Sequence, residues 1–233
     1  MRRFDLVVWD WDGTVVDSTG AIADAIIGAA ADLGLPVPSE HEARWVIGMG
    51  LLEAIHHAVP AIRREQVPAF VERYRVHYLR RDATLKMFDG IPELLRGLDA
   101  AGVPLAVATG KSRAGLNRAL VQTGLGPRFA ATRCADEGAP KPDPWMLRDL
   151  GETLMTPTDR MVMIGDTTHD VGMAQSAGAS SIAVLYGAHE PDALRASAPD
   201  ALIGSVGELA DWLAEACGVE RSLLGPAPGP GRR

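Results

Sequence analysis

The stretch LVVWDWDGT, residues 6–14, decides the fold of this 233-residue chain. A short apolar run followed at once by polar residues and glycine is typical of a buried strand in a parallel sheet. A second stretch of the same form, MVMIGDTTHD, occupies residues 161–170. Because open α/β sheets bind ligands at the carboxyl ends of their strands, we expect the aspartates of both stretches to meet at one edge of the sheet.

These aspartates predict a metal centre. Asp10 and Asp12 follow the first apolar run, and Asp166 and Asp170 follow the second. Carboxylates that are crowded together repel one another, so they need a cation or a proton nearby. Oxygen ligands of this kind suit Mg²⁺. We therefore expect a magnesium–carboxylate site.

From residue 88 onward, apolar runs alternate with segments of helical periodicity. This alternation is the signature of a parallel sheet with crossover helices. We expect helices at 91–101, 112–123, 143–154, 171–177 and 205–217, and strands at 103–108, 130–133, 161–164 and 181–185. The predicted fold class is α/β: a Rossmann-like parallel sheet core with helices on both faces.

Residues 17–86 differ from the segments on either side. Helical periodicity runs over 21–33, a capping box is expected from Ser39 to Glu42, and a further helix is expected over 65–81. This predicts a small all-helical cap inserted after the first strand. The core would then comprise 1–16 and 87–220, and the glycine- and proline-rich end, 221–233, would be a flexible tail.

Asp10 and Asp12 are suited to phosphoryl transfer. A carboxylate such as Asp10 can act as a nucleophile and form an acyl phosphate, which divides one difficult displacement into two easier ones. Asp12 lies two residues on, on the same side of an extended segment. Its carboxyl group can protonate the leaving oxygen and then activate water.

Other polar residues fit the same reaction. Thr109 and the N–H groups that begin the next helix can bind phosphoryl oxygens. Lys141 would neutralise the charge shared by nucleophile and phosphate. Asp166, supported by Asp170, would complete the cation site and stabilise charge in the transition state. Asp170 also fits a helix-capping role, and both roles can coexist.

Four motifs carry a family resemblance. DWDGTV (10–15), VATGK (107–111), KPDP (141–144) and IGDTTHD (164–170) resemble, in order and spacing, the four motifs of the haloacid dehalogenase-like (HAD) hydrolases. The helical insert resembles the cap of phosphoglycolate phosphatases, pyrophosphatases, β-phosphoglucomutases and haloacid dehalogenases. Segment 47–51 lies where such caps place their specificity loop.

The resemblance implies a role for each matching residue. By this resemblance Asp10 is the nucleophile and Asp12 the acid/base; Thr109, Gly110 and Lys141 hold the phosphate; Asp10, the Asp12 backbone carbonyl and Asp166, with Asp170 in support, hold Mg²⁺. Trp11 stands where the family commonly has phenylalanine, and we expect it to pack away from the site. His169 has no family role.

The expected function is a magnesium-dependent phosphatase that hydrolyses a small phosphomonoester through an aspartyl phosphate, with phosphoglycolate phosphatase as the nearest named activity. A pyrophosphatase or a broad sugar-phosphate phosphatase would look much the same. A β-phosphoglucomutase-like isomerase is less favoured, because the cap lacks the arginine-bearing pattern expected of it. A dehalogenase would have little use for Asp12 or the second aspartate pair. A phospho-acceptor switch would have neither the inserted cap nor Asp12.

Several polar residues outside the motifs have a plainer interpretation. His56 and His57 on a helix of the insert are expected at the surface, as are Arg44 and Arg113. Lys111 is nearer the phosphate site, and its role stays open.

The composition and net charge of the chain limit the classes of molecule that it is expected to bind. Hydrophobic residues make up 47% of the chain and charged residues 23%, which is ordinary for a globular protein. A net charge of −7 without a basic stripe argues against a nucleic-acid partner. No apolar stretch is long enough to span a bilayer, and the first strand begins too early for a signal peptide. We expect a cytoplasmic protein with reduced cysteines, acting on a small phosphorylated metabolite; its oligomeric state stays open.

Overall fold

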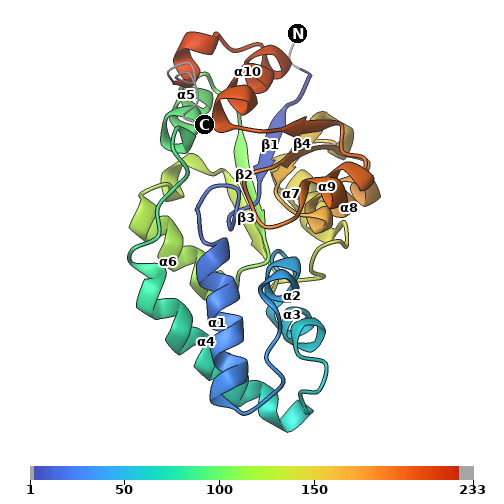
Figure 1. Ribbon diagram of the computed structural model, residues 1–233. Helices are drawn as coiled ribbons and strands as arrows, with labels where there is room; N and C mark the ends of the chain where they lie inside the picture. The colour runs from blue at the N-terminus through green and yellow to red at the C-terminus, as the bar shows by residue number, and fades with distance from the viewer. Residues whose placement is uncertain (1–2, 226–233) are drawn as a thin grey trace.

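The computed structural model describes residues 3–225, and they are built on one parallel sheet (Figure 1). The order of its strands is β3-β2-β1-β4-β5-β6. The strands are β1 (Leu6–Trp9), β2 (Leu105–Thr109), β3 (Ala131–Cys134), β4 (Met161–Gly165), β5 (Ser180–Val184) and β6 (Ala201–Ile203). The first strand is central and fully buried, as its apolar sequence predicts for a strand covered on both faces.

Helices cover both faces of the sheet. Along β1, Val7 and Trp9 face one apolar cluster, while Leu6 and Val8 face another. The first cluster is closed by α5 (Ile91–Ala100), α6 (Arg113–Thr123) and α10 (Val206–Cys217), and the second by α7 (Trp145–Leu154) and α8 (Thr168–Ala177). The predicted fold class, a Rossmann-like sheet with helices on both faces, is confirmed.

The helices between β1 and residue 87 bury an apolar cluster largely of their own. They are α1 (Thr19–Asp32), α2 (Glu40–Trp45), α3 (Leu51–Ala58) and α4 (Val67–Asp82). Helices α1 and α4 lie side by side below the sheet in Figure 1. The capping box predicted at the start of α2 is present: the Ser39 hydroxyl accepts from the Glu42 N–H, and the Glu42 carboxylate accepts from the Ser39 N–H. The division of the chain into a core and a cap, with boundaries at 16 and 87, stays a prediction.

Some elements differ from those expected. The helix expected from residue 143 begins at Trp145, because the Asp143 side chain instead accepts a hydrogen bond from the Trp145 N–H. The helix expected over 65–81 divides into a single 3₁₀ turn, Arg64–Gln66, followed by α4. Two short elements escaped the sequence pattern, α9 (Pro191–Ala196) and β6.

The expected flexible tail, 221–233, begins too early. Arg221–Leu224 forms a 3₁₀ helix whose Leu224 side chain is 2% exposed and joins the core cluster under α5. The apolar pair at 223–224 lets this turn pack, which the glycine- and proline-rich stretch after it obscures in the sequence. The remainder of the expected tail, 226–233, lies outside the described residues.

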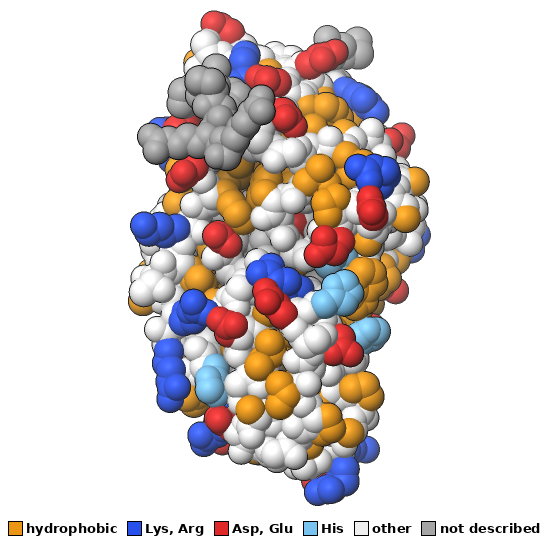
Figure 2. Space-filling view, viewed as in Figure 1, with side chains coloured by type: hydrophobic (Ala, Val, Ile, Leu, Met, Phe, Trp, Pro, Cys, Tyr) orange, Lys and Arg blue, Asp and Glu red, His pale blue; other side chains and the backbone are white. Residues whose placement is uncertain are grey.

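The surface shown in Figure 2 carries acidic and basic side chains interspersed, without a continuous basic stripe on that face. Within residues 3–225, no helix has both the length and the apolar character needed to cross a membrane.

Candidate active site

The order of the strands brings the predicted residues together. Because β1 lies between β2 and β4, the strand ends that carry Asp10, Thr109 and Asp166 emerge next to one another. The Asp10 N–H donates to the Ile164 carbonyl at 2.8 Å, which extends the pairing of β1 with β4 to the site itself. The side chains of Asp10, Asp12, Thr109, Lys141, Asp166 and Asp170 are all buried.

Lys141 joins two of the carboxylates. Its ammonium donates to Asp10 Oδ1 at 2.7 Å and to Asp170 Oδ1 at 2.6 Å, and its side chain is 0% exposed. Burial alone lowers the pKa of Lys141, but the attraction of the two carboxylates outweighs burial and raises it. The ammonium therefore stays charged at neutral pH.

The three carboxylates of Asp10, Asp166 and Asp170 form a tight cluster, in which one oxygen of each lies within 4.8 Å of the others. Asp166 accepts hydrogen bonds from the Thr14 hydroxyl at 2.9 Å and the Ala188 N–H at 2.7 Å. Burial raises the pKa of Asp10 to about 7, and burial with the two neighbouring carboxylates raises the pKa of Asp166 well above its usual range. The protein alone thus leaves this cluster short of positive charge.

The residues present fit a divalent cation. Asp10 Oδ2 is buried and has no hydrogen-bond partner anywhere in residues 3–225. If all three carboxylates are ionised, the single ammonium of Lys141, which pairs with Asp10 and Asp170, leaves two negative charges without a counterpart. Carboxylate oxygens are also the donors that Mg²⁺ prefers. A hard cation such as Mg²⁺ would bind Asp10 Oδ2, which has no other partner, and would neutralise the excess negative charge.

Asp170 serves two purposes, though not quite as expected. We predicted that it caps a helix beginning at Val171, but α8 begins at Thr168 and its N-cap is Thr167. Asp170 Oδ2 instead accepts from the N–H and hydroxyl of Thr167, at 3.0 and 2.6 Å, and completes a capping box. Its other oxygen binds Lys141. Helix capping and contact with the carboxylate cluster therefore coexist.

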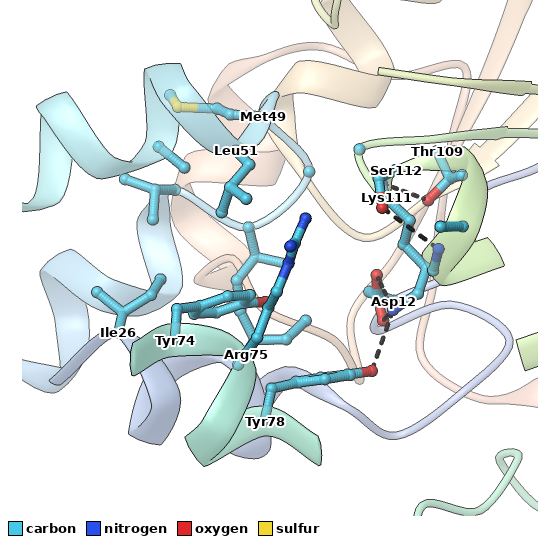
Figure 3. A pocket seen from close by; sticks show the side chains of 18 of the residues that line it. Asp12, Ile26, Met49, Leu51, Tyr74, Arg75, Tyr78, Thr109, Lys111 and Ser112 are labelled. Carbon is cyan, nitrogen blue, oxygen red and sulfur yellow. Dashed lines mark hydrogen bonds and ion pairs between the residues drawn. The ribbon is translucent and has the colours of Figure 1, made fainter. Parts of the chain in front are cut away.

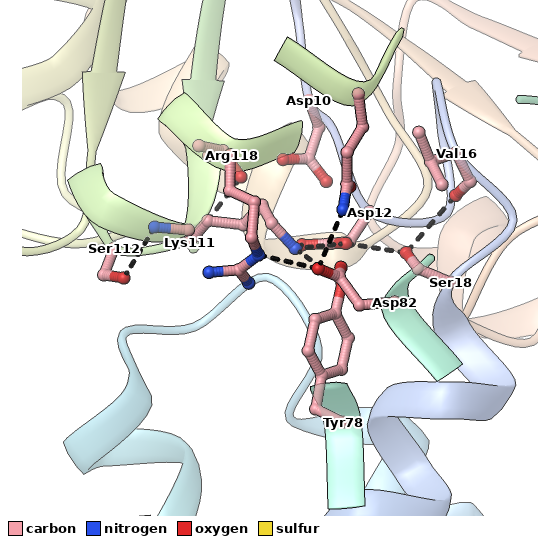
Figure 4. A network of polar contacts seen from close by, with 12 residues as sticks. Asp10, Asp12, Val16, Ser18, Tyr78, Asp82, Lys111, Ser112 and Arg118 are labelled. Atoms are coloured by element: carbon pink, nitrogen blue, oxygen red, sulfur yellow. Dashed lines mark hydrogen bonds and ion pairs between the residues drawn. The ribbon is translucent and has the colours of Figure 1, made fainter. Parts of the chain in front are cut away.

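Asp12 is not part of that cluster. It is held by Ser18 and Lys111 instead (Figure 4). Its carboxylate accepts from the Ser18 hydroxyl at 2.6 Å and from the Lys111 ammonium at 2.9 and 3.0 Å. The same ammonium donates to the Tyr78 hydroxyl of α4 at 3.0 Å. Asp10 and Asp12 thus pair with different lysines although only one residue separates them. The metal role expected for Asp12 concerned its backbone carbonyl and stays a prediction.

Lys111 and Tyr78 are the site residues that sequence reasoning did not assign. Burial lowers the pKa of Lys111, but Asp12 more than compensates and raises it. Burial and the Asp12 carboxylate raise the pKa of Tyr78 to about 12. The position of Lys111 directly after Thr109 and Gly110 could have indicated that it lies at the site. No local sequence pattern distinguishes Tyr78 from the other tyrosines of the chain as a site residue.

A cavity of about 400 Å³ opens in front of these groups (Figure 3). Asp10, Asp12, Thr109, Gly110 and Lys111 line one side of it, and residues of α1, α3, α4 and the loop before α3 line the other. The loop expected to be near the substrate, 47–51, contributes several of these lining residues. A ligand in this cavity would touch both the strand ends and the helical insert.

Gly110 lies against the loop of the insert. A Cβ at this position would come within 2.7 Å of the carbonyl oxygens of Gly48 and Met49. Backbone atoms cannot swing aside as a flexible side chain does, so any larger residue must push the loop away from the strand end.

We therefore expect Gly110→Ala to lower kcat/KM for an aryl phosphate by about 10²-fold, the effect of misplacing a binding loop by about 1 Å. Gly20→Ala is the matched control, because a Cβ there meets no atom within 4 Å. Steady-state kinetics on both variants checks the prediction. Unchanged kcat/KM in Gly110→Ala would show that this close contact is irrelevant to turnover.

The polar residues outside the four motifs for which the sequence favoured a surface position do not line the cavity. His56 and His57 are exposed on α3, as expected. Arg44 and Arg113 are engaged by carboxylate and hydroxyl side chains and do not line the cavity. Trp11 is 1% exposed and packs edge-on against Phe129 in the core, as expected.

His169 contacts the helical insert, a role that the sequence did not suggest. It and His189 both place Nε2 near the Trp45 carbonyl at the end of α2, at 3.2 and 2.9 Å. His189 Nδ1 accepts from the Thr168 N–H, so Nε2 carries the proton and donates to that carbonyl. Burial lowers the pKa of His189 to about 4, which keeps the ring neutral. The histidines thus hold the end of α2 against α8.

The chain is similar to known proteins over most of its length. Residues 7–184 match the model of a family described as haloacid dehalogenase-like hydrolase. The chain is 35% identical over 225 residues to the probable phosphatase IndB of Dickeya dadantii, covering 94% of each chain. It is 32% identical over 220 residues to a phosphoglycolate phosphatase of Neisseria meningitidis, covering 90% of this chain and 93% of that one. The structure of a hydrolase from Pseudomonas syringae shares the fold, with a TM-score of 0.83 at 22% identity over 91% of this chain and 98% of that one.

Proposed function

Because this chain belongs to the haloacid dehalogenase-like hydrolases, in their phosphoglycolate phosphatase-like subfamily, we propose that it is a magnesium-dependent phosphomonoesterase that works through an aspartyl phosphate. The observation that carries the proposal is the placement of the two aspartates. Asp10 and Asp12 line the same cavity, yet one is paired with Lys141 and the other with Lys111. Two carboxylates in different surroundings suit two different tasks.

Asp10 is the nucleophile in this proposal. One of its carboxylate oxygens attacks phosphorus, and the bond from phosphorus to the ester oxygen breaks as the new bond forms. The Thr109 hydroxyl and the N–H groups at Gly110 and beyond bind the phosphoryl oxygens. Lys141, 2.7 Å from Asp10 Oδ1, offsets the negative charge that builds up between carboxylate and phosphoryl group.

Asp12 is the general acid and then the general base in this proposal. Its carboxyl group gives a proton to the departing alkoxide, so that an alcohol leaves. The resulting carboxylate then takes a proton from water, whose oxygen attacks phosphorus and releases Asp10 and orthophosphate. Ser18 and Lys111 orient the carboxylate for both steps from 2.6 and 2.9 Å.

Asp10, the Asp12 carbonyl and Asp166, with Asp170 in support, would hold the Mg²⁺ ion. When bound, the ion neutralises charge on the phosphoryl group. The buried Asp10 oxygen without a partner and the excess of carboxylates over ammonium groups support this assignment.

Removal of magnesium is expected to lower phosphate release by about 10³-fold, because a cation that stabilises transition-state charge contributes several kcal/mol. A second readout is thermal stability: Mg²⁺ should raise Tm by relieving repulsion among the buried carboxylates. Asp166→Asn should lose most of that rise, whereas Asp192→Asn, at a side chain 96% exposed, should retain it. A Tm independent of Mg²⁺ in the wild type would contradict the cation site.

The activity itself is tested by phosphate release from phosphoglycolate, pyrophosphate, several sugar phosphates and an aryl phosphate. Magnesium-dependent release of orthophosphate from a monoester supports the proposal. Turnover of pyrophosphate alone would favour the pyrophosphatase alternative, and return of the phosphoryl group to a sugar would favour an isomerase.

A further inference from the structure

We infer that the cavity takes a phosphomonoester whose organic part is an apolar, ring-sized group carrying an anionic substituent. This inference rests on the proposed phosphatase function, because it assigns the phosphoryl group to the Asp10 end of the cavity. It concerns what fills the rest.

The cavity is larger than a two-carbon phosphate ester requires. Its volume is about 400 Å³, whereas an apolar cavity of about 150 Å³ is enough to hold benzene. Once a phosphoryl group lies against Asp10 and Thr109, space for a ring-sized group therefore remains. Phosphoglycolate, with only a methylene and a carboxylate beyond the ester oxygen, would leave much of this space empty.

The wall facing that space is apolar. The lining residues are Ile22 and Ile26 from α1, Met49 in the loop before α3, Leu51 at the start of α3, and Tyr74 from α4. Figure 3 shows all of them except Ile22 with labels. Apolar side chains around a ligand favour apolar ligand surface, because both surfaces leave water together. The same wall offers a sugar few hydrogen-bond partners for its hydroxyl groups.

Two tyrosines add a flat surface. The rings of Tyr74 and Tyr78 are stacked, with centroids 5.9 Å apart and an angle of 16° between their planes. Both line the cavity, and the Tyr78 hydroxyl is held by Lys111. Aromatic faces attract other rings in offset or edge-on arrangements. This favours an aromatic group in the substrate over a flexible alkyl chain.

Arg75 of α4 supplies a positive charge at the cavity wall. Of the cations that line the cavity within residues 3–225, Lys111 is paired with Asp12 and Arg118 with Asp82, whereas Arg75 forms no hydrogen bond or ion pair there. Its guanidinium rises beside Tyr74 into the space between Leu51 and Lys111 (Figure 3). An unpaired guanidinium at a cavity wall is suited to bind a carboxylate or a second phosphate.

The test compares four esters that leave as similarly basic alkoxides: ethyl phosphate, benzyl phosphate, 4-carboxybenzyl phosphate and phosphoglycolate. Matching the leaving groups ensures that differences in kcat/KM report binding rather than intrinsic reactivity. With Mg²⁺ present, we expect kcat/KM for benzyl phosphate to be at least about tenfold higher than kcat/KM for ethyl phosphate. The carboxyl group should add a further factor of about ten.

Variants assign these preferences to the residues named. Leu51→Asn should reduce the preference for benzyl over ethyl phosphate by about tenfold. Leu52→Asn is the matched control, because Leu52 is the next residue of α3, is 61% exposed and does not line the cavity. Arg75→Gln should remove the preference for 4-carboxybenzyl over benzyl phosphate.

The outcomes separate this inference from the function on which it rests. Hydrolysis of phosphoglycolate or ethyl phosphate as efficiently as benzyl phosphate would overturn the inference and leave the phosphatase intact. A carboxybenzyl preference that survives Arg75→Gln would overturn the role of Arg75. Failure to release phosphate from all four esters, by folded protein with Mg²⁺, would overturn the inference. It would contradict the proposed phosphatase only if the sugar phosphates and the aryl phosphate are not hydrolysed either.

Discussion

Asp10→Asn is expected to lower kcat for phosphate release by at least about 10⁴-fold, because an amide cannot form the acyl phosphate that the reaction requires. The substitution preserves the size of the side chain in a position that is 1% exposed. No phosphoryl-enzyme should be detected in this variant when it is mixed with labelled substrate and quenched in acid. Residual kcat within about tenfold of wild type would rule out Asp10 as the nucleophile.

The loss can be separated from a folding defect. Lys141 keeps its ion pair with Asp170 at 2.6 Å when Asp10 becomes neutral, so its buried ammonium is not left alone. A circular dichroism spectrum and Tm establish that the variant is folded. Asp17→Asn, at an exposed aspartate close by in the chain, is the matched control and should retain wild-type kcat.

Asp12→Asn is expected to slow turnover by about 10²- to 10⁴-fold, the usual contribution of a general acid and base. The effect should differ between the two half-reactions. An aryl phosphate has a leaving group that departs without protonation, so the first step should persist. Attack by water still needs a base, so the aspartyl phosphate should accumulate.

The distinguishing measurement is a burst of phenol. Asp12→Asn mixed with excess aryl phosphate should release about one equivalent per protein rapidly and then continue slowly. Ser18→Ala removes only the hydrogen bond of 2.6 Å to Asp12, so a milder loss of about tenfold is expected. Steady-state release at the wild-type rate in Asp12→Asn would contradict its role in the second step.

The contacts of Asp12 also connect the chemistry to the helical insert. Lys111 holds Asp12 with the same ammonium that donates to Tyr78 of α4. Gly110, next to it, lies against the carbonyl groups of Gly48 and Met49. Any movement of the insert therefore acts on the strand end that carries the phosphate-binding groups, which is why we expect Gly110→Ala to affect turnover.

The fold class follows from short-range patterns in the sequence. Apolar runs that end in polar residues at 10, 109 and 166 predict strands, and the alternation with helical periodicity predicts a parallel sheet. The short elements α9 and β6 escaped because three to six residues carry too little periodicity to be recognised. The packed turn at 221–224 escaped because the tail after it dominates the composition.

Residue types at strand ends, together with Lys141 in the proline-rich loop before α7, led from the sequence alone to one predicted constellation. Its members are Asp10, Asp12, Thr109, Lys141, Asp166 and Asp170. Only the tertiary structure decided which lysine pairs with which aspartate, and that Tyr78 and Arg75 face the cavity. The reason is physical. A strand end is defined by its own few residues, whereas an ion pair or a cavity wall depends on how α4, β1 and β2 pack against one another, and no local pattern records that arrangement.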